Sequence, residues 1–530
     1  MELLAAILIG ACGFLLRLLY SAGETSDEWV SLWLIRREAC FSRPSYAVPD
    51  SLIEGTYDYP IGFHWLLSRI PERFSILAAR FLNIIPDLLH GLALYLFVRW
   101  ATESVFLSLF ALAYYLTLPV LLPTTPRMKA IKARAFGTIP VSCFLLGVYL
   151  GSAVHHAFFL LAAAGVWLAA YSSLFAYQAT LFFGVLLSIF LPSWWPVLIV
   201  AVVVSAGLLF PALQIRNPLL FWWRHKRWYM RNIRSKSPAA NRSKLSLFLL
   251  PYYLVRRPRD AGNLFFYDSP LLIGLYSTPL VFIILWFVLT NNTVQTLLST
   301  DPLTHFLWAV TASSLVLFGA TMLPGLLIFG EAERYFEYSA AFFVALFTLL
   351  QNQLALLSVQ AMGFLLLWNC TVLLLLLVFL NYRRILSTTP LQDEQELREV
   401  AEKLKTLSHA RVASLPIKLS YLLSALTMHR KQRKRGRQGP TFYYRFITRE
   451  GDRSFSYFEC DLETLNTFSG TPQRLQELYG ITHLVIDKNY VAKRKSAFIE
   501  EAIRLPKVYE TQRYTIVALT RRGGNACAES

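Results

Sequence analysis

The chain has 530 residues, of which 55% are hydrophobic and only 16% are charged, and its mean hydropathy is +0.44. This composition excludes an ordinary soluble globular protein, because apolar runs such as 197–210 and 364–380 have no polar face to present to water. The formal net charge of +18 lies mostly in 216–259 and 403–495. In a membrane protein it favours phosphate carried on lipids, and no nucleic acid, as the anionic partner.

Apolar runs of about 17–26 residues recur along the chain, and each is long enough to cross a hydrocarbon core of about 30 Å as a helix. The runs are 1–20, 75–98, 104–122, 136–152, 155–171, 174–191, 194–213, 270–290, 304–329, 337–357 and 361–381. The first run lacks a basic leader, so we expect a retained helix and not a removed signal. The sequence therefore predicts an all-α polytopic membrane domain of about eleven transmembrane helices over 1–382.

The connections between these runs alternate between charged and nearly uncharged. An odd number of spans places every charged connection, and the tail after residue 381, on one face of the membrane. A count of Lys and Arg would make that face cytoplasmic. Cations that bind a phosphorylated substrate would break this rule for functional reasons, so we expect the face to look outward from a cell inner membrane. The charged connections are 21–74, 123–135, 214–269 and 330–336.

Two adjacent acids, Asp27 and Glu28, follow the first apolar run almost at once. Adjacent carboxylates at a membrane boundary can activate a hydroxyl as general base or hold a divalent cation. The structural alternative is the N-terminal cap of a helix over 28–37, where acids favour the positive end of the helix dipole. A cap also fixes the position of a carboxylate, so the two roles are compatible.

The connection 214–269 interleaves aromatic and basic residues between Phe221 and Arg231. This pattern is typical of a helix that lies in the headgroup plane, with its rings at the interface and its cations on lipid phosphates. A nucleic-acid site has a similar composition, but the position between two membrane spans argues against one.

The segment 383–530 has the composition of a small soluble α/β domain. Helical spacing and capping residues predict three helices, and β-branched and aromatic runs predict four strands. The helices are expected at 392–407, 471–479 and 495–504, and the strands at 442–447, 454–459, 483–486 and 514–519. We assign this domain no chemistry and expect it to dock a partner or shape the acceptor site.

The acids after the first span, together with a Tyr-Asp-Tyr-Pro motif at 57–60 and an aromatic stretch from His64, resemble integral-membrane glycosyltransferases of the GT-C class. This class includes the protein-mannosyltransferase-like and lipid A aminoarabinose transferase-like families. The segment 330–338 is similar to an Arg-Tyr motif that many of these enzymes carry between late spans. The resemblance covers 1–382 and implies a polyprenyl-phosphate sugar donor and inverting transfer. It makes Asp27 the catalytic residue, with Glu28 as its neighbour.

The same resemblance implies a set of substrate-binding residues. Cations of the second charged connection would hold the donor phosphate as it leaves, although anchoring to anionic lipids is the structural alternative. Arg334 would grip the phosphate while Glu331 or Glu333 orients it. The full set is Tyr57, Asp58, His64, Arg127, Lys129, Lys132, Arg134, Glu331, Glu333, Arg334 and Tyr335.

We therefore expect a membrane glycosyltransferase that moves a sugar from this donor to a lipid-linked or cell-surface glycan acceptor, with anionic membrane lipids as further partners. The chain lacks the second Asp-x-Asp and the Trp-Trp-Asp signature of oligosaccharyltransferases, so protein N-glycosylation is not expected. A divalent cation is possible but not established. One alternative is a transporter or flippase of lipid-linked glycans, which needs polar mid-membrane groups and internal pseudo-symmetry. Another is a non-enzymatic scaffold whose basic tail recruits a partner.

Overall fold

The computed structural model describes residues 1–21, 26–122, 131, 133–232, 250–256, 264–386, 390–407, 409–428, 439–449 and 467–519. The chain divides into two compact units. The helical unit comprises Met1–Glu24, Pro60–Phe63 and Ile70–Leu386, and the α/β unit comprises Thr25–Tyr59, His64–Arg69 and Ser387–Ser530. The first loop therefore contributes most of its residues to the unit formed by the tail.

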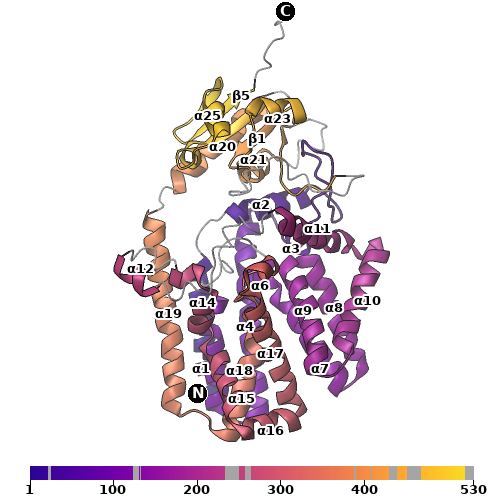
Figure 1. Cartoon of the computed structure of the whole chain (residues 1–530), viewed down its shortest axis with the longest axis vertical. Coiled ribbons are helices and arrows are strands. Elements are labelled where there is room, and N and C mark those ends of the chain that lie inside the picture. Colours follow the sequence, from indigo (N-terminus) through magenta and orange to yellow (C-terminus); the bar gives the residue numbers. More distant parts are fainter. Residues whose placement is uncertain are drawn as a thin grey trace, which may run out of the picture. The chain divides into compact units, whose positions relative to one another are not determined.

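The helical unit is built from helices, many of them long (Figure 1). Its longer helices are α1 (Glu2–Ser21), α4 (Glu72–Thr102), α5 (Val105–Thr117), α7 (Thr138–Ala153), α8 (Phe159–Ser172), α9 (Leu174–Phe190), α10 (Trp195–Leu209), α11 (Arg216–Asn232), α15 (Pro279–Thr290), α17 (Pro302–Thr321), α18 (Arg334–Leu354) and α19 (Val359–Leu386). Shorter elements are η1 (Pro119–Leu121), α6 (Ala133–Phe136), η2 (His156–Phe158), η3 (Pro211–Leu213), α12 (Leu250–Arg256), η6 (Leu264–Asp268), α14 (Pro270–Ser277), α16 (Asn292–Thr300) and η7 (Pro324–Phe329). The helix α3 (Gly62–Ser68) begins in this unit and ends in the other.

Every predicted apolar run is helical, but a total of about eleven spans is not confirmed. Within the described residues, five helices are long and apolar enough to cross a membrane. A sixth span results if α14 and α15, which meet at 86°, are counted together. Four further apolar helices, α5, α8, α9 and α10, are shorter. At about 1.5 Å per residue they fall short of a hydrocarbon core of about 30 Å.

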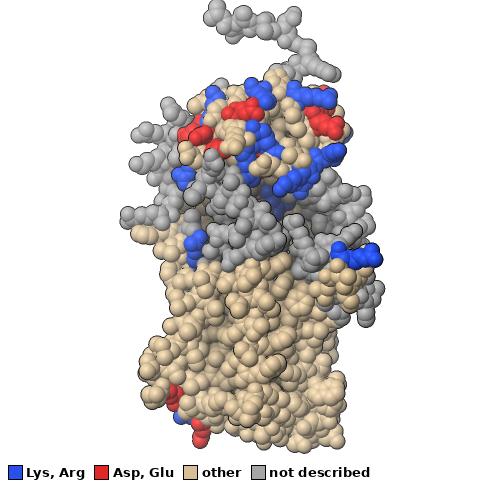
Figure 2. Space-filling view, turned by 90° about the vertical axis from the view of Figure 1, so that its left-hand side faces the viewer, with Lys and Arg blue, Asp and Glu red and all other residues tan. Residues whose placement is uncertain are grey.

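The outer surface of the helical unit is apolar. Large hydrophobic side chains such as Leu15, Leu89, Leu198 and Leu374 are more than one third exposed. On the face shown in Figure 2 this unit is almost entirely free of charged side chains, whereas Lys, Arg, Asp and Glu gather on the surface of the α/β unit. A soluble protein rarely exposes so much contiguous apolar surface, so the helical unit has the surface of a membrane domain.

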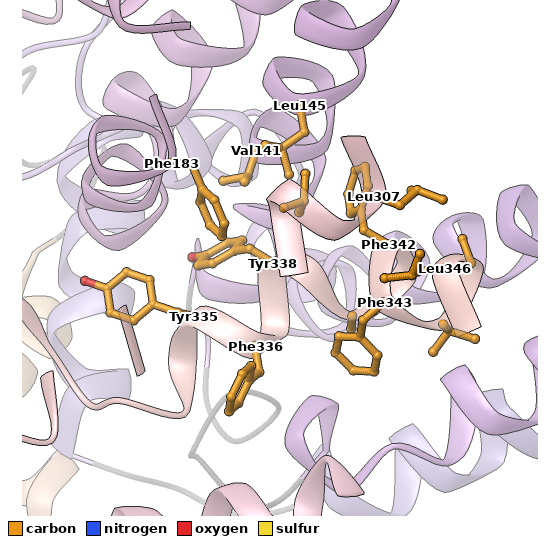
Figure 3. Packing of buried hydrophobic residues seen from close by; sticks show 14 of the residues in the cluster. Val141, Leu145, Phe183, Leu307, Tyr335, Phe336, Tyr338, Phe342, Phe343 and Leu346 are labelled. Carbon is orange, nitrogen blue, oxygen red and sulfur yellow. The ribbon is translucent and has the colours of Figure 1, made fainter. Parts of the chain in front are cut away.

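The helix α18 lies in the middle of the hydrophobic core of the helical unit. Figure 3 shows its aromatic side chains in contact with the neighbouring helices. The labelled residues of α18 are Tyr335, Phe336, Tyr338, Phe342, Phe343 and Leu346, and their neighbours are Val141 and Leu145 of α7, Phe183 of α9 and Leu307 of α17. Because nearly all residues of α18 from Tyr335 to Leu350 are buried, the helix is held firmly in this core.

A buried ion pair joins α1 to α4 inside the helical unit. Arg17 Nε donates to Asp87 Oδ2 at 2.9 Å, and both side chains are fully buried. The guanidinium also donates to the carbonyl oxygens of Gly13 and Leu116 at 3.1 and 3.0 Å. A charge within an apolar helix needs such partners, so the arginine that interrupts the end of the first apolar run has a structural role.

The α/β unit is built on a five-stranded mixed sheet in the order β2-β1-β3-β5-β4. β1 pairs in parallel with β2 and β3, and β5 pairs antiparallel with β3 and β4. The strands are β1 (Arg411–Leu415), β2 (Thr441–Phe442), β3 (His483–Asp487), β4 (Lys507–Glu510) and β5 (Tyr514–Ala518). The helices are α2 (Ser26–Glu38), α20 (Pro390–Thr406), α21 (Leu419–Thr427), α23 (Pro472–Tyr479), α24 (Lys488–Val491) and α25 (Ala497–Ile503).

Most elements predicted for the tail are confirmed. The helices at 392–407, 471–479 and 495–504 and the strands at 483–486 and 514–519 are present. Thr471 caps α23 by accepting a hydrogen bond from the backbone N–H of Arg474. The predicted strand at 442–447 shrinks to β2, and the one at 454–459 lies outside the described residues.

Candidate functional site

The turn that opens α18 gathers three of the predicted ionisable residues. Gly330 has a φ of +104°, and a Cβ atom at this position would lie 2.5 Å from the ring of Phe175. Only glycine accepts both conditions. The tight turn brings Arg334 Nε within 2.5 Å of Glu331 Oε2 and places its guanidinium 5.3 Å from the centroid of the Phe175 ring. The side chains of Arg334 and Glu331 remain 25% and 32% exposed, so this ion pair is accessible to a ligand.

A second, buried ion pair lies one turn further along α18. Arg134 on α6 donates to both carboxylate oxygens of Glu337, with Nε 3.0 Å from Oε2. The two side chains are 7% and 0% exposed. Such a bidentate pair ties α6, which lies at the end of the second charged connection, to the start of α18. Since the guanidinium of Arg134 is held by Glu337, Arg334 is the better placed of the two to meet a phosphate.

Tyr335 connects the same turn to two other elements. Its hydroxyl donates to the carbonyl of Phe329 at 2.8 Å and accepts from Gln178 Nε2 at 2.8 Å. Trp222 Nε1 on α11 donates in turn to Gln178 Oε1 at 3.1 Å. This network links α18, η7, α9 and α11, so Tyr335 holds the turn in place through its hydroxyl.

Lys226 is a further cation near the first turn of α18, and the sequence analysis did not select it as a site residue. It lies on α11, which is not among the candidate spans of the described residues. Its Nζ donates to the carbonyl of Ile328 and lies 6.0 Å from the centroid of the Phe329 ring. Burial, together with the nearby guanidinium of Arg334, lowers the pKa of Lys226 to about 7. A neighbouring phosphate would favour its protonated form.

The shifted pKa of Lys226 predicts how stability depends on pH. Because the value in the folded chain lies below the 10.5 of an ordinary lysine, the unfolded chain binds more protons between these two values. The stability contributed by this group therefore rises as the pH increases from about 7 to about 10. We expect Lys226→Met to be more stable than the wild type below about pH 7, and the difference to vanish toward about pH 10.

Thermal unfolding in detergent across this pH range measures the effect. Lys226→Arg is the control. Because arginine stays charged throughout this pH range, the stability of this variant should not show the rise with pH that Lys226 contributes. A gap between wild type and Lys226→Met that is independent of pH would contradict the assignment.

The first-loop candidates belong to the α/β unit, where the structure brings three of them close together. Tyr57 packs against Tyr59, with ring centroids 6.1 Å apart, and Tyr59 lies 6.3 Å from the ring of His64. Tyr57, Asp58 and His64 are all buried. Burial raises the pKa of Tyr57 well above its ordinary value, with Tyr421 and Tyr59 adding to the shift, so its hydroxyl stays protonated.

The remaining candidates are described in part or not at all. Asp27 and Glu28 are the second and third residues of α2, whose N-terminal position agrees with the expected helix start, while their side chains lie outside the described structure. Arg127, Lys129 and Lys132 lie outside the described residues. Glu333 is buried beside the turn of α18. Within the described residues, no group of three His, Cys, Asp or Glu side chains is arranged to hold a metal ion.

The helical unit thus presents an accessible Arg–Glu pair on a rigid base. Arg334 is oriented by Glu331, the turn beneath it is fixed by Tyr335, and Lys226 adds a second cation nearby. Chemically, such an arrangement can bind a phosphate and stabilise the negative charge that develops when a phosphate leaves.

Comparison with known proteins identifies the fold. No protein-family model matches the chain, and no curated protein matches its sequence. Among solved structures, the archaeal oligosaccharyltransferase AglB from Archaeoglobus fulgidus, in complex with an inhibitory peptide and a dolichol-phosphate, is similar with a TM-score of 0.50. Its sequence identity is 13%, over 92% of this chain and 69% of that chain.

Two further solved structures are similar over most of the chain. The apo form of the Archaeoglobus fulgidus oligosaccharyltransferase has a TM-score of 0.48 and 13% identity over 92% of this chain and 69% of its own. ArnT from Cupriavidus metallidurans, bound to undecaprenyl phosphate, has a TM-score of 0.41 and 11% identity over 97% of both chains. At these identities the likeness concerns the fold alone. The chain has the fold of the GT-C-type membrane glycosyltransferases, as the motifs of its first loop and late spans predicted.

Proposed function

We propose that this chain is a membrane glycosyltransferase that moves a sugar from a polyprenyl-phosphate-linked donor to a lipid-linked or cell-surface glycan acceptor. The observation that carries the proposal is the accessible Arg334–Glu331 pair at the start of α18, in a chain with a GT-C fold. The AglB structure was solved with a dolichol-phosphate, which is a lipid phosphate of the expected kind.

In the proposed reaction, Asp27 accepts the proton of an acceptor hydroxyl while the hydroxyl oxygen attacks the anomeric carbon of the donor sugar. A new glycosidic bond forms, the bond between the anomeric carbon and the phosphate oxygen breaks, and the electron pair stays with the phosphate. Attack opposite the leaving group inverts the anomeric centre. No other reactant is needed.

Arg334 would stabilise the departing phosphate, because its charge is in place before the reaction and needs no reorganisation. Glu331 would orient the guanidinium, and Lys226 would contribute a second charge in its protonated form. We also propose five further residues as ligands of the donor or acceptor: Asp58, His64, Arg127, Lys129 and Lys132.

Binding of undecaprenyl phosphate to the purified protein in nanodiscs tests the role of Arg334. We expect Arg334→Ala to weaken binding by about tenfold to a hundredfold, since one charge-assisted contact contributes about 1.5–3 kcal/mol. Arg334→Lys should restore part of the loss, because it keeps the charge but not the planar fork.

Arg99→Ala is the matched control. Arg99 pairs with Glu2 at 2.9 Å in an ion pair of similar exposure, 39% and 32%, on α4 and α1 of the same unit. We expect Arg99→Ala to leave the binding of undecaprenyl phosphate unchanged. Equal affinity of the wild type for undecaprenol and undecaprenyl phosphate would contradict the proposal. Translocation of a lipid-linked sugar without a new glycosidic bond would identify a flippase instead.

A further inference from the structure

The first loop and the tail, far apart in the sequence, form one hydrophobic core within the α/β unit. Trp33 of α2 is fully buried. The centroid of its ring lies 5.0 Å from that of Tyr421 on α21, 4.9 Å from that of Tyr444 and 5.3 Å from that of Tyr57. Two of these three rings belong to the tail, so α2 is held on its buried face by residues from the far end of the chain.

Polar contacts fasten the same two segments beside these rings. Arg36 Nη1 donates to the carbonyl of Ala425, in the last turn of α21, at 2.6 Å. The carboxylate of Asp50 accepts hydrogen bonds from Ser424 Oγ at 2.7 Å and from the hydroxyl of Tyr444. Hydrogen bonds that involve a charged group are stronger than neutral ones, and all three of these are partly buried.

Backbone pairing completes the attachment. Leu52 N–H donates to the carbonyl of Phe442 at 2.9 Å, and Phe442 N–H donates to the carbonyl of Asp50 at 2.8 Å. Further along, Thr56 and Thr448 exchange hydrogen bonds at 2.9 and 2.7 Å. The first loop therefore extends the edge of the tail's sheet beyond β2, and its register is fixed by main-chain geometry.

We infer that the tail domain is the scaffold that positions the catalytic helix, and that Trp33, Arg36 and Asp50 act as positioning residues. Trp33 acts through Tyr421 and Tyr444, Arg36 through the carbonyl of Ala425, and Asp50 through Ser424 and Tyr444. These seven residues are called the aromatic clasp. The inference rests on the proposed function, because it takes Asp27 as the general base. Asp27 lies six residues before Trp33 on α2, about 9 Å along the helix axis. A rigid helix carries a shift at Trp33 to the carboxylate of Asp27, and a misplacement of about 1 Å costs about a hundredfold in rate.

The test uses the full chain and two readouts. Hydrogen exchange of the α2 backbone amides reports whether the helix is held, and the kinetics of sugar transfer report whether Asp27 is in position. We expect Trp33→Ala to speed exchange in α2 and to lower kcat by about tenfold or more, with the KM for the donor changed by less than about twofold. Trp33→Phe should restore most of both, because it keeps a ring among the tyrosines.

Phe498→Ala is the matched control for lost core packing. Phe498 is a buried aromatic residue of α25 in the same unit, and its ring lies 5.5 Å from that of Phe468. We expect it to reduce the thermal stability of the unit without changing kcat or exchange in α2. Tyr444→Phe is a milder variant that removes the hydrogen bond to Asp50 and keeps the ring, and it should lower kcat by about threefold.

Two results would overturn the inference. One is unchanged exchange in α2 of Trp33→Ala, and the other is an equal loss of kcat in Phe498→Ala. If the wild type transfers no sugar at all, the proposed function fails by itself. The exchange data still decide whether the clasp holds α2.

Discussion

We expect Asp27→Asn to reduce sugar transfer by about a hundredfold to ten-thousandfold, the range that a positioned general base contributes. Asparagine keeps the shape of the side chain, and at the second position of α2 the change removes only a small favourable interaction between the charge and the helix dipole. Therefore α2 should still begin at Ser26, and only the ability to accept a proton is lost. Donor binding should change little, because the phosphate contacts assigned to Arg334 remain. The expected signature is a loss of kcat at nearly constant KM.

The control for this variant is Glu54→Gln. Glu54 is an exposed acid of the same loop, and its replacement removes one negative charge without touching the start of α2. We expect it to retain wild-type kinetics. Full activity of a well-expressed Asp27→Asn protein would remove Asp27 from the mechanism.

Replacing Glu337 by Ala destabilises the helical unit by about 3–5 kcal/mol, because it leaves the guanidinium of Arg134 buried without its carboxylate. The change should also disturb the proposed phosphate site. Glu337 and Arg334 lie at the same end of α18, and Arg134 ties α6 to that end. Both the apparent melting temperature in detergent and sugar transfer should fall. A Glu337→Ala protein as stable as the wild type would contradict the buried pair.

The double variant Arg134→Met/Glu337→Leu separates the structural role of the pair from a binding role of Arg134. Two apolar side chains of similar size fill the space without leaving a buried charge, so most of the stability should return. We expect transfer to return with it, because the guanidinium of Arg134 is engaged by Glu337. Restored stability without restored transfer would show that Arg134 itself contacts the donor phosphate.

The helices of this protein follow from its sequence because apolar runs are a local signal. The number of spans does not, since α5 has 13 residues and α10 has 15, and only the folded structure shows where each helix ends. In the tail, β3 and β5 are rich in β-branched residues and were predicted. β1 is buried, but its sequence contains Ala and Ser, and β4 is short and largely exposed. Neither sequence therefore has the run of β-branched and aromatic residues that predicts a strand.

The candidate site was only partly visible in the sequence. The ionisable residues of 330–338 stand out because they interrupt an apolar region, and of the two acids offered, Glu331 and Glu333, the structure pairs Arg334 with Glu331. Lys226 could not be distinguished from the headgroup-facing cations around it, because its burial depends on contacts with Ile328 and Phe329 about a hundred residues away.

Contacts between residues that are distant in the sequence could not be predicted for the same reason. Asp87 is a single acid in an apolar run, and nothing local connects it to Arg17. The pairing of the first loop with the tail joins residues nearly 400 positions apart, as between Asp50 and Tyr444. Such contacts are set by tertiary packing and leave no periodic signal in the sequence.

We propose that the general base Asp27 and the phosphate-binding Arg334 work at one face of the membrane. Single cysteines at Glu54 and Glu331, in a chain without its native cysteines, test it by labelling with a membrane-impermeant maleimide in sealed vesicles of known orientation. We expect both positions to be labelled from the same side. Labelling from opposite sides would leave the two groups without a common substrate, and the proposed reaction would be impossible.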